Sequence, residues 1–452
     1  MPVPAGERFG VSAQGPAPHA VIAGGGIAGL AAAAGLAGAG WRVTLFERRQ
    51  RIAEEQADPL SPGGRALGAG IQMSPNACRC LKALGAFDAV AASAFRPQAA
   101  VLREGRSGRV IYRAPLGAAA EARWGAPYLH VYRADLVAAL AAAATAAGAV
   151  LRPATQVLDA EEHDSHVAIE VGPVREGDDA AVSSQSSLAS PSSPAEAIEA
   201  DLLLVADGLG SRLRATLFGD APRRFTGQTA WRAVLAADTL PEAARMPPDA
   251  TVWAGPGRHV VTYYLRGGAL LNLVAVEEAS LWESESWSTE GDPARLRAAF
   301  AGFDPALTSL ISAVEQPLLW GLFDRDQPPR WHTRRSVLLG DAVHPMLPFM
   351  AQGAAMALED AAVLAAVLSE MPECAATLGA QLAKYEAARR ARATRVQRVS
   401  RENGTLFHRA DGLRRRFDHA LIGAVSRLAP SLAAGRLDWL YGHDALGGLG
   451  SA

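Results

Sequence analysis

The first regular pattern along the chain is an apolar run, a glycine-rich turn and a long stretch of small apolar residues. His19–Ala23 is short, apolar and followed by glycines, which predicts a buried strand. Ile27–Ala39 is long enough for a helix, and the run Arg42–Glu47 after it predicts a second strand. A strand, a helix and a strand in this order predict an α/β fold with a parallel sheet.

Further along, the hydrophobic period changes to that of strands and then back to that of helices. GPG and RGG turns separate the strands predicted at Trp231–Ala236, Ala250–Trp253, His259–Leu265 and Ala269–Val276. Helical periodicity returns at Pro293–Phe300 and dominates from Ala354 to about His408. We therefore expect a Rossmann-like α/β domain in two parts, residues 18–220 and 335–452, interleaved with a β-sheet domain at 221–334. The C-terminal region is expected to be helical.

Two segments have a composition that cannot bury enough apolar surface to pack. Residues 1–17 are predicted to be a disordered tail. The stretch Gly172–Glu196 contains VSSQSSLASPSSP and is predicted to be a disordered insertion. The strands predicted at His166–Val171 and Ala197–Val205 would flank it as a hairpin, although a linker between domains is an open alternative.

Composition and charge exclude several classes of function. The formal net charge of −2 gives no electrostatic reason to bind nucleic acid or an anionic membrane. The three cysteines, Cys78, Cys80 and Cys374, suit a reducing compartment and supply neither a disulfide framework nor a zinc site. No signal peptide is visible, and Leu136–Ala147 is too short to span a bilayer. We expect a cytoplasmic protein without a metal site.

The glycine turn has the spacing of a dinucleotide-binding fingerprint. Gly24 would allow the tight turn, Gly26 would let a pyrophosphate approach the backbone, and Gly29 would let helix and strand pack closely. Glu47 ends the next strand at about 20 residues from the turn, where a carboxylate can accept hydrogen bonds from an adenosine ribose. An acid at this position favours an unphosphorylated ribose.

Two later strands also end in an acid at a glycine turn. Asp207 follows the apolar run Leu202–Ala206, and Asp341 follows Ser336–Leu339. The loop that begins at Pro348 opens a long helix, whose positive N-terminal end could stabilise negative charge on a ring placed there. As bare chemistry, Asp207 and the arginines after it could face phosphates or solvent.

These motifs, in this order, resemble the FAD-dependent aromatic hydroxylases, the group A flavoprotein monooxygenases. The resemblance rests on GGGIAGL with Glu47, on DGLGSRLR, and on GDAVHPMLPFMAQGAAMALEDA, and it covers about residues 18 to 445. GAGIQMSPNA, YRADL, GQTAWRA and RGGALLNLVAVEE are similar to the salicylate and 3-hydroxybenzoate hydroxylase branch.

The resemblance implies FAD as the cofactor and a role for each matched residue. Glu47 would hold the adenosine ribose, Arg133 would approach the FAD phosphates or ribityl chain, and Asp341 would bind the ribityl chain. Gly353 and Ala354 would cover the pyrimidine edge of the flavin. Together with Gly24, Gly26, Gly29 and Asp207, these are the predicted cofactor-binding residues.

The resemblance also implies a single-component monooxygenase that uses NAD(P)H and O₂ through a flavin hydroperoxide. The chain has one dinucleotide fold, so the nicotinamide would bind transiently in a groove. Asp207 lies where the family links FAD phosphate binding to use of the nicotinamide cofactor. The expected substrate is a small, hydroxybenzoate-like aromatic compound.

The substrate side is less defined by sequence. Pro348 falls where family members let a loop residue face the substrate ring, and Arg232 could pair with a carboxylate. Some relatives place a histidine base near Gly227, where this chain has Gln228, so the base stays unassigned. The candidate catalytic residues are Gln228, His259, Tyr264 and Pro348, with Tyr263 on the same strand as His259.

Other readings stay open. A flavin halogenase would need a WxWxIP run, and a disulfide reductase would need paired redox cysteines and a second GxGxxG; the chain has none of these. A non-catalytic flavin-binding redox sensor is an alternative, as is the same chemistry on a neutral polycyclic substrate. The choice between NADH and NADPH, the question of decarboxylation, and homodimer formation are undecided by sequence.

Overall fold

The computed structural model describes most of the chain. The described residues are 17–52, 60, 70–174, 196–219, 221–280, 282, 289–372, 374–428 and 435–448. Of the two segments predicted to be disordered, residues 1–16 and 175–195 lie outside the described residues.

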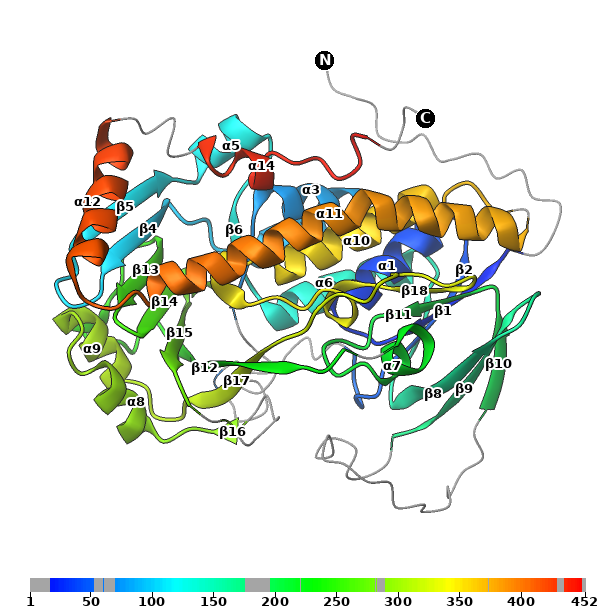
Figure 1. The fold of residues 1–452 in the computed structure, drawn as a ribbon, viewed down its shortest axis with the longest axis horizontal. Coiled ribbons are helices and arrows are strands. Elements are labelled where there is room, and N and C mark those ends of the chain that lie inside the picture. Colours follow the sequence, from blue (N-terminus) through cyan, green and yellow to red (C-terminus); the bar gives the residue numbers. More distant parts are fainter. Residues whose placement is uncertain are drawn as a thin grey trace.

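A five-stranded parallel sheet forms the nucleotide-binding half of the molecule, in the order β18-β11-β1-β2-β7 (Figure 1). Its strands are β1 (His19–Ala23), β2 (Arg42–Phe46), β7 (Val150–Arg152), β11 (Leu202–Val205) and β18 (Ser336–Leu338). The helices that contact α1 (Ile27–Gly38) most are α6 (Arg133–Ala146) and α10 (Gly353–Val367). The predicted α/β class is confirmed.

Small residues explain how closely α1 lies against its neighbours. Eight of its twelve residues are buried, and most of these are alanine or glycine. A Cβ on Gly35 would lie 2.7 Å from the Cβ of Ala365, so only glycine allows this approach of α1 to α10. The alanine and glycine residues of α1 therefore allow this helix to pack closely against its neighbours.

An eight-stranded sheet forms the other half, in the order β16-β17-β12-β15-β14-β13-β4-β5. Its strands are β4 (Ala99–Glu104), β5 (Val110–Pro115), β12 (Arg224–Ala236), β13 (Ala250–Gly255), β14 (Arg258–Leu265), β15 (Leu270–Glu278), β16 (Thr289–Glu290) and β17 (Leu318–Asp324). One face is covered by α8 (Pro293–Phe300) and α9 (Pro305–Ser312), which share an apolar cluster with it. The sequence analysis did not foresee that β4 and β5, from before residue 221, join this sheet.

A three-stranded antiparallel sheet contains β8 (Thr155–Glu162), β9 (Val167–Pro173) and β10 (Glu196–Ala200). β9 and β10 pair directly, with Val171 opposite Glu196, which confirms the predicted hairpin. The single strand predicted at Ala197–Val205 is wrong, because the chain leaves the hairpin at Asp201 and enters the parallel sheet as β11. The Asp201 carboxylate accepts a hydrogen bond of 2.8 Å from the His19 amide at this crossing.

The helical stretch predicted from Ala354 to about His408 forms two helices, α10 and α11 (Ala375–Phe407), which are separated around Pro372. At 1.5 Å per residue, α11 is roughly 50 Å long. It runs diagonally across the molecule from the parallel sheet to the eight-stranded sheet (Figure 1).

The remaining helices and strands lie between or after these elements. They are β3 (Gly70–Met73), α3 (Pro75–Ala83), α4 (Phe87–Ser93), α5 (Ala118–Trp124), β6 (Leu129–Tyr132), α7 (Arg212–Phe218), α12 (Leu413–Leu428) and α14 (Asp438–Tyr441), with 3₁₀ turns at η1 (Glu242–Ala244), η2 (Arg266–Gly268), η3 (Gly340–Ala342) and η4 (Pro348–Met350). Within the described part of the chain, we find no helix with the length and apolar character to cross a membrane.

Candidate active site

The glycine turn between β1 and α1 is shaped by close backbone contacts. Gly24 has a φ of 109°, and a Cβ there would lie 2.5 Å from the Ala206 carbonyl oxygen. A Cβ on Gly29 would lie 1.9 Å from the carbonyl oxygen of Gly24. At Gly26, in contrast, a Cβ would meet no atom within 4 Å. Two glycines are therefore required by packing, and the third borders open space at the N-terminus of α1.

Glu47 holds the turn from the end of β2. Its Oε2 accepts a 2.6 Å hydrogen bond from the Gly25 amide, and its Oε1 accepts one of 2.9 Å from the Arg49 amide. An ionised carboxylate has about four lone-pair sites. The lone-pair sites of Glu47 that these two amides leave free can still accept hydrogen bonds from the hydroxyl groups of a ribose.

Three charged residues lie around the glycine turn and the first turn of α6, and we infer that they line a cleft. Arg133, Asp207 and Asp341 all keep solvent-accessible surface. Burial nevertheless raises the pKa of Asp207 to about 6 and raises the pKa of Asp341. Burial lowers the pKa of Arg133, and the charges of Asp341 and Glu47 oppose that shift. Groups that surrounding protein desolvates but that solvent still reaches are typical of a cleft. Arg133 lies within electrostatic reach of Asp341 and Glu47.

The face of the eight-stranded sheet opposite α8 and α9 turns towards this cleft. Alternation along β12 buries Trp231 against the helices, where its Nε1 donates to Glu277 at 3.0 Å. Arg232 therefore lies on the opposite face, with its guanidinium 4.3 Å from the centre of the Trp320 ring. Burial lowers the pKa of Arg232 to about 10, and the charge of Arg133 acts in the same direction.

Gln228 and His259 share that face, and both lie next to His408, the C-cap residue of α11. His259 Nδ1 lies 2.7 Å from His408 Nε2, and Gln228 Nε2 lies 3.4 Å from His408 Nδ1. The His259 ring packs edge-on against Phe349 at 5.3 Å between centroids. Gln228, His408 and Phe349 also line a cavity of about 460 Å³.

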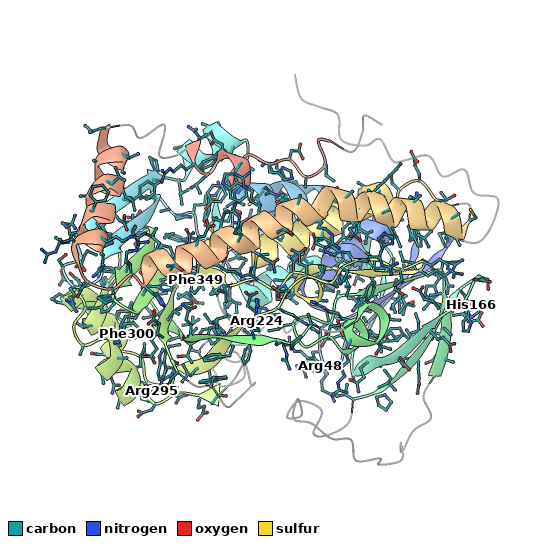
Figure 2. The ribbon with its side chains drawn as sticks, viewed as in Figure 1. Arg48, His166, Arg224, Arg295, Phe300 and Phe349 are labelled. Atoms are coloured by element: carbon teal, nitrogen blue, oxygen red, sulfur yellow. The ribbon has the colours of Figure 1, made fainter. Side chains whose placement is uncertain are left out.

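Pro348 stands next to this cluster, in the loop between η3 and α10. It is exposed, whereas Leu347 and Phe349 on either side of it are buried. Phe349 lies against α11 in the half of the molecule that holds the eight-stranded sheet (Figure 2). Gly353 and Ala354 form the first turn of α10, directly after the loop.

Tyr264 is not brought into this group. Its hydroxyl donates to the Met246 carbonyl at 2.9 Å, and its ring packs with Phe95 and the cluster under α8 and α9. Its neighbour Tyr263 occupies the cleft-facing side, where it packs with Tyr132. His166 lies at the far end of the molecule from Phe349 (Figure 2).

Comparison with known proteins gives the family. A family model described as FAD binding domain matches residues 18–256 and 309–400. A 3-amino-4-hydroxybenzoate 2-monooxygenase of Streptomyces platensis is 37% identical over 95% of this chain and 96% of its own length. A 3-hydroxybenzoate 6-hydroxylase of Aquipseudomonas alcaligenes is 34% identical over 94% of this chain and 98% of its own length.

The chain belongs to the FAD-dependent aromatic hydroxylases. A solved structure of a salicylate hydroxylase substrate complex has a TM-score of 0.74 and 25% identity to this hydroxylase, covering 95% of this chain and 96% of that one. The predicted family, the FAD cofactor and the NAD(P)H-dependent monooxygenase class are thereby confirmed.

The described residues of the hydroxylase fit FAD. The open space at Gly26 lies at a helix N-terminus, where backbone N–H groups suit a phosphate. Within the described residues, the guanidinium of Arg133 makes no hydrogen bond or ion pair with protein, so it can meet an anion. Glu47 and Asp341, whose charges act on Arg133, offer carboxylate oxygens to hydroxyl groups of the cofactor.

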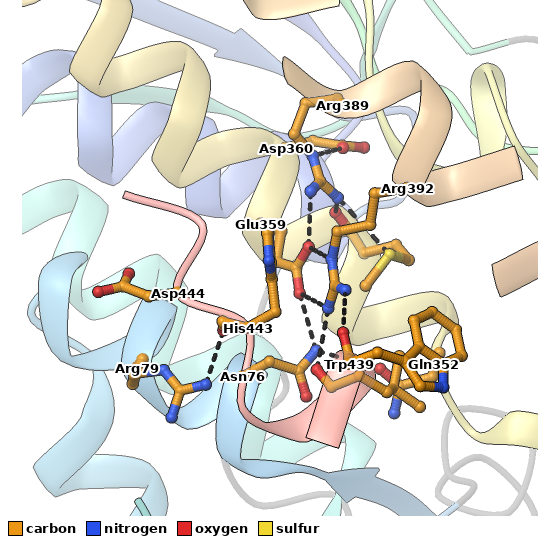
Figure 3. Close-up of polar contacts among 12 residues, drawn as sticks. Asn76, Arg79, Gln352, Glu359, Asp360, Arg389, Arg392, Trp439, His443 and Asp444 are labelled. Atoms are coloured by element: carbon orange, nitrogen blue, oxygen red, sulfur yellow. Dashed lines mark hydrogen bonds and ion pairs between the residues drawn. The ribbon is translucent and has the colours of Figure 1, made fainter. Parts of the chain in front are cut away.

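A buried polar network supports the N-terminus of α10 from behind (Figure 3). Gln352, just before the helix, donates to Ser74 at 2.9 Å and accepts from Asn76 at 3.1 Å. Asn76 also donates to Glu359 at 2.8 Å. Arg389 of α11 then binds Glu359 at 2.6 Å and Asp360 at 2.9 Å.

The network reaches from α10 to the end of the chain. Arg392 binds Glu359 and donates to the carbonyls of Trp439 and Leu440 at 3.0 Å each. His344 lies 2.6 Å from Asp360, and together with Arg389 it holds the pKa of that carboxyl at about 2, although burial acts in the opposite direction. The charges within this cluster largely compensate one another.

Sequence reasoning missed His408, Gln352 and Arg389. Asn76 and Gln352 lie inside motifs that the sequence analysis quoted, so the motif itself was a signal for their involvement. His408 and Arg389 lie on a polar helix and had no such signal. Their importance appears only when α11 is placed against its partners.

Proposed function

We propose that the hydroxylase adds a hydroxyl group to a small aromatic acid that already bears a hydroxyl group. The observation that carries this is Arg232, a cation on the sheet face that turns towards the nucleotide cleft. The relatives named above act on hydroxybenzoates or an aminohydroxybenzoate, and another relative, from Bordetella bronchiseptica, is a 6-hydroxynicotinate 3-monooxygenase that is 34% identical over 85% of this chain and 91% of its own length.

Burial of a carboxylate needs a cation, because an unpaired buried charge is costly. Arg232 already lies over Trp320 and is desolvated enough to lower its pKa to about 10. A substrate carboxylate beside it would pair with this desolvated cation and raise its pKa again. The Trp320 ring, in a cluster with Leu347 and Phe349, supplies an apolar wall for an aromatic ring.

For the cofactor, we propose the assignments made from sequence. Gly24, Gly26 and Gly29 shape the pyrophosphate turn, and Glu47 holds the adenosine ribose. Arg133 compensates phosphate charge, and Asp341 binds the ribityl chain. The remaining proposed contacts are Asp207, Gly353 and Ala354.

FAD supplies electron transfer from NAD(P)H and activation of O₂. The protein residues exclude water, hold the substrate ring and handle protons. Positive charge at the N-terminus of α10, at Gly353 and Ala354, stabilises negative charge that develops on a ring next to it. Pro348, exposed between two buried neighbours, is the residue that we place against the substrate.

For proton handling, we propose His259 and His408, with Gln228 orienting the second ring. The Gln228 amide nitrogen can only donate, so His408 Nδ1 accepts and His408 Nε2 carries a hydrogen towards His259 Nδ1. His259 then carries its own hydrogen on Nε2. Burial, and after it the charge of His408, lowers the pKa of His259 well below its ordinary value, so both rings are neutral at pH 7.

The test is a screen of aromatic acids for stimulated NAD(P)H oxidation, with the product mass measured. Hydroxybenzoates, aminohydroxybenzoates and hydroxynicotinates should stimulate oxidation and gain one oxygen atom, and the screen with NADH and NADPH shows which cofactor is used. Stimulation only by neutral polycyclic compounds would move the substrate to the second candidate. Oxidation that no aromatic compound stimulates would favour the redox sensor. Cytoplasmic location and homodimer formation stay predictions.

A further inference from the structure

The loop that carries Pro348 is held by a polar face of α11. Gln397 Nε2 donates to the Pro345 carbonyl at 2.7 Å, and Ser400 Oγ donates to the Leu347 carbonyl at 2.6 Å. Asn403 Nδ2 donates to the Phe349 carbonyl at 3.2 Å. The three donors are spaced three residues apart on the helix, so they share one face. They bind every second carbonyl of the loop.

The same face continues with a glycine. A Cβ on Gly404 would lie 2.6 Å from Cε2 of Phe349, so the phenyl ring occupies the place where a side chain would stand. Gln397 is itself fixed, because its Oε1 accepts a 2.6 Å hydrogen bond from Gln327. Gln397 and Ser400 are buried. These contacts are internal and shielded from water, which makes them stronger than surface hydrogen bonds.

The pattern of contacts also sets what the loop presents outward. Leu347 and Phe349 are pulled against α11 and buried, and Pro348 between them is left exposed. Among the described residues, the Pro348 carbonyl has no hydrogen bond from α11 and accepts one from the Ala351 amide at 3.0 Å, within the turn itself. The loop is thus fixed through the residues on either side of Pro348, and the face of Pro348 stays free.

The helix that holds the loop also binds both halves of the molecule. Arg389, before the donors, binds α10 through Glu359 and Asp360. Arg401, among them, binds Asp324 of β17 at 2.6 Å, and His408 after them binds His259 of β14. One helix, α11, therefore fixes the position of the loop relative to both the eight-stranded sheet and α10.

We propose that Gln397, Ser400 and Asn403 are positioning residues for hydroxylation, which fix Pro348 against the substrate ring. This inference rests on the proposed function. In the coupled reaction, NAD(P)H, a proton, O₂ and the substrate give NAD(P)⁺, water and the hydroxylated product. If the ring is misplaced, NAD(P)H, a proton and O₂ give NAD(P)⁺ and H₂O₂ instead. Loss of these hydrogen-bond donors should therefore lower the amount of hydroxylated product and raise the amount of H₂O₂ formed per NAD(P)H oxidised.

The experiment compares Ser400→Ala, Asn403→Ala and the double variant with Arg398→Ala. Arg398 is a matched control on the same helix, because its side chain is exposed and pairs only with Glu402 among the described residues. The readouts on the FAD-loaded enzyme are product formed per NAD(P)H oxidised, H₂O₂ formed, FAD affinity, and hydrogen exchange of the amides in residues 346–351. Ser400→Thr keeps the hydroxyl group and serves as the rescue variant.

The donor variants should form several-fold less product per NAD(P)H, with correspondingly more H₂O₂ and faster exchange in the loop. Their FAD affinity should match that of the wild type, and Arg398→Ala and Ser400→Thr should behave like the wild type. Unchanged coupling in the double variant would overturn the proposal, whether or not exchange rises. If Ser400→Ala does not fold, Asn403→Ala, whose side chain is only half-buried, decides the question by the same readouts. A wild type that hydroxylates no aromatic acid would instead refute the proposed function.

Discussion

His259 and His408 share a hydrogen bond of 2.7 Å between Nδ1 of the first ring and Nε2 of the second, although 149 residues separate them. Both rings are buried, and His408 also lies 3.6 Å from the Glu278 carboxylate at the edge of the cavity. This pair connects the eight-stranded sheet to the C-terminal end of α11. It gives the site two neutral imidazoles in contact.

The first prediction concerns pH and the stability of the apoprotein. Burial lowers the pKa of His408 to about 4, with Arg258 adding to the shift, from an unfolded value of 6.5. Between these values the unfolded chain binds more protons, so the free energy of unfolding falls as the pH is lowered through this window. The loss from His408 should be roughly 2 kcal/mol at about pH 5 compared with about pH 7.

Urea unfolding of the wild type and of His408→Gln at both pH values checks this. The variant should lose less stability on acidification, and His163→Gln, at an exposed position, should follow the wild type. Parallel curves for the wild type and His408→Gln would show that His408 is not held in its neutral form by the fold.

The second prediction concerns the buried network in Figure 3. Arg389→Met should lower the free energy of unfolding by about 3–5 kcal/mol, because it leaves two fully buried carboxylates without their shared cation. Arg398→Ala removes a surface pair on the same helix and should cost about 1 kcal/mol or less. Denaturant midpoints measure both. Equal, small effects would mean that the network adapts to the loss of Arg389.

The third prediction concerns FAD. Asp341→Ala should weaken FAD binding by about 10–100-fold, the range expected for a lost hydrogen bond to a charged group. Asp238→Ala, at an exposed position, is the control and should bind FAD like the wild type. Titration of the apoprotein with FAD, followed by flavin fluorescence, measures both. An unchanged affinity in Asp341→Ala would remove Asp341 from the site.

The fourth prediction concerns Arg232 and the substrate carboxylate. The wild type should bind salicylate more tightly than its methyl ester, and Arg232→Ala should lose about ten-fold or more of that preference. Arg224→Ala on the same strand removes an exposed cation paired with Asp326 and should keep the preference. Dissociation constants from the flavin absorbance change supply the values. Equal preference in the wild type and Arg232→Ala would assign the cation elsewhere.

The parts of the fold that sequence predicted are those that local physics determines. The turn from Gly24 to Gly29 and the strands beside it have short-range glycine and hydrophobic patterns, so the β1–α1–β2 unit was foreseen with nearly correct bounds. β4 and β5 were not foreseen, because β4 pairs with β13, about 150 residues later, and short strands carry too little pattern to reveal such a partner.

The same distinction holds for the candidate site. Strand alternation places Trp231 and Arg232 on opposite faces of β12, but the sequence does not show which face borders the cofactor cleft. The face is decided by where α8 and α9 pack, because they cover the other one. The same packing puts Tyr264 under these helices and leaves Tyr263 on the side of the cleft. His408 could not have been predicted, since its role arises from the angle at which α11 crosses the substrate sheet.

One measurement tests the central claim most directly. The purified, FAD-loaded enzyme is supplied with NAD(P)H and a hydroxybenzoate under ¹⁸O₂ in ordinary water, and the product is analysed by mass spectrometry. The account predicts a product that has gained one hydroxyl group whose oxygen is ¹⁸O, in proportion to the NAD(P)H consumed and not released as H₂O₂. A product without ¹⁸O, or NAD(P)H consumption that yields only H₂O₂ with every aromatic acid tested, would contradict it.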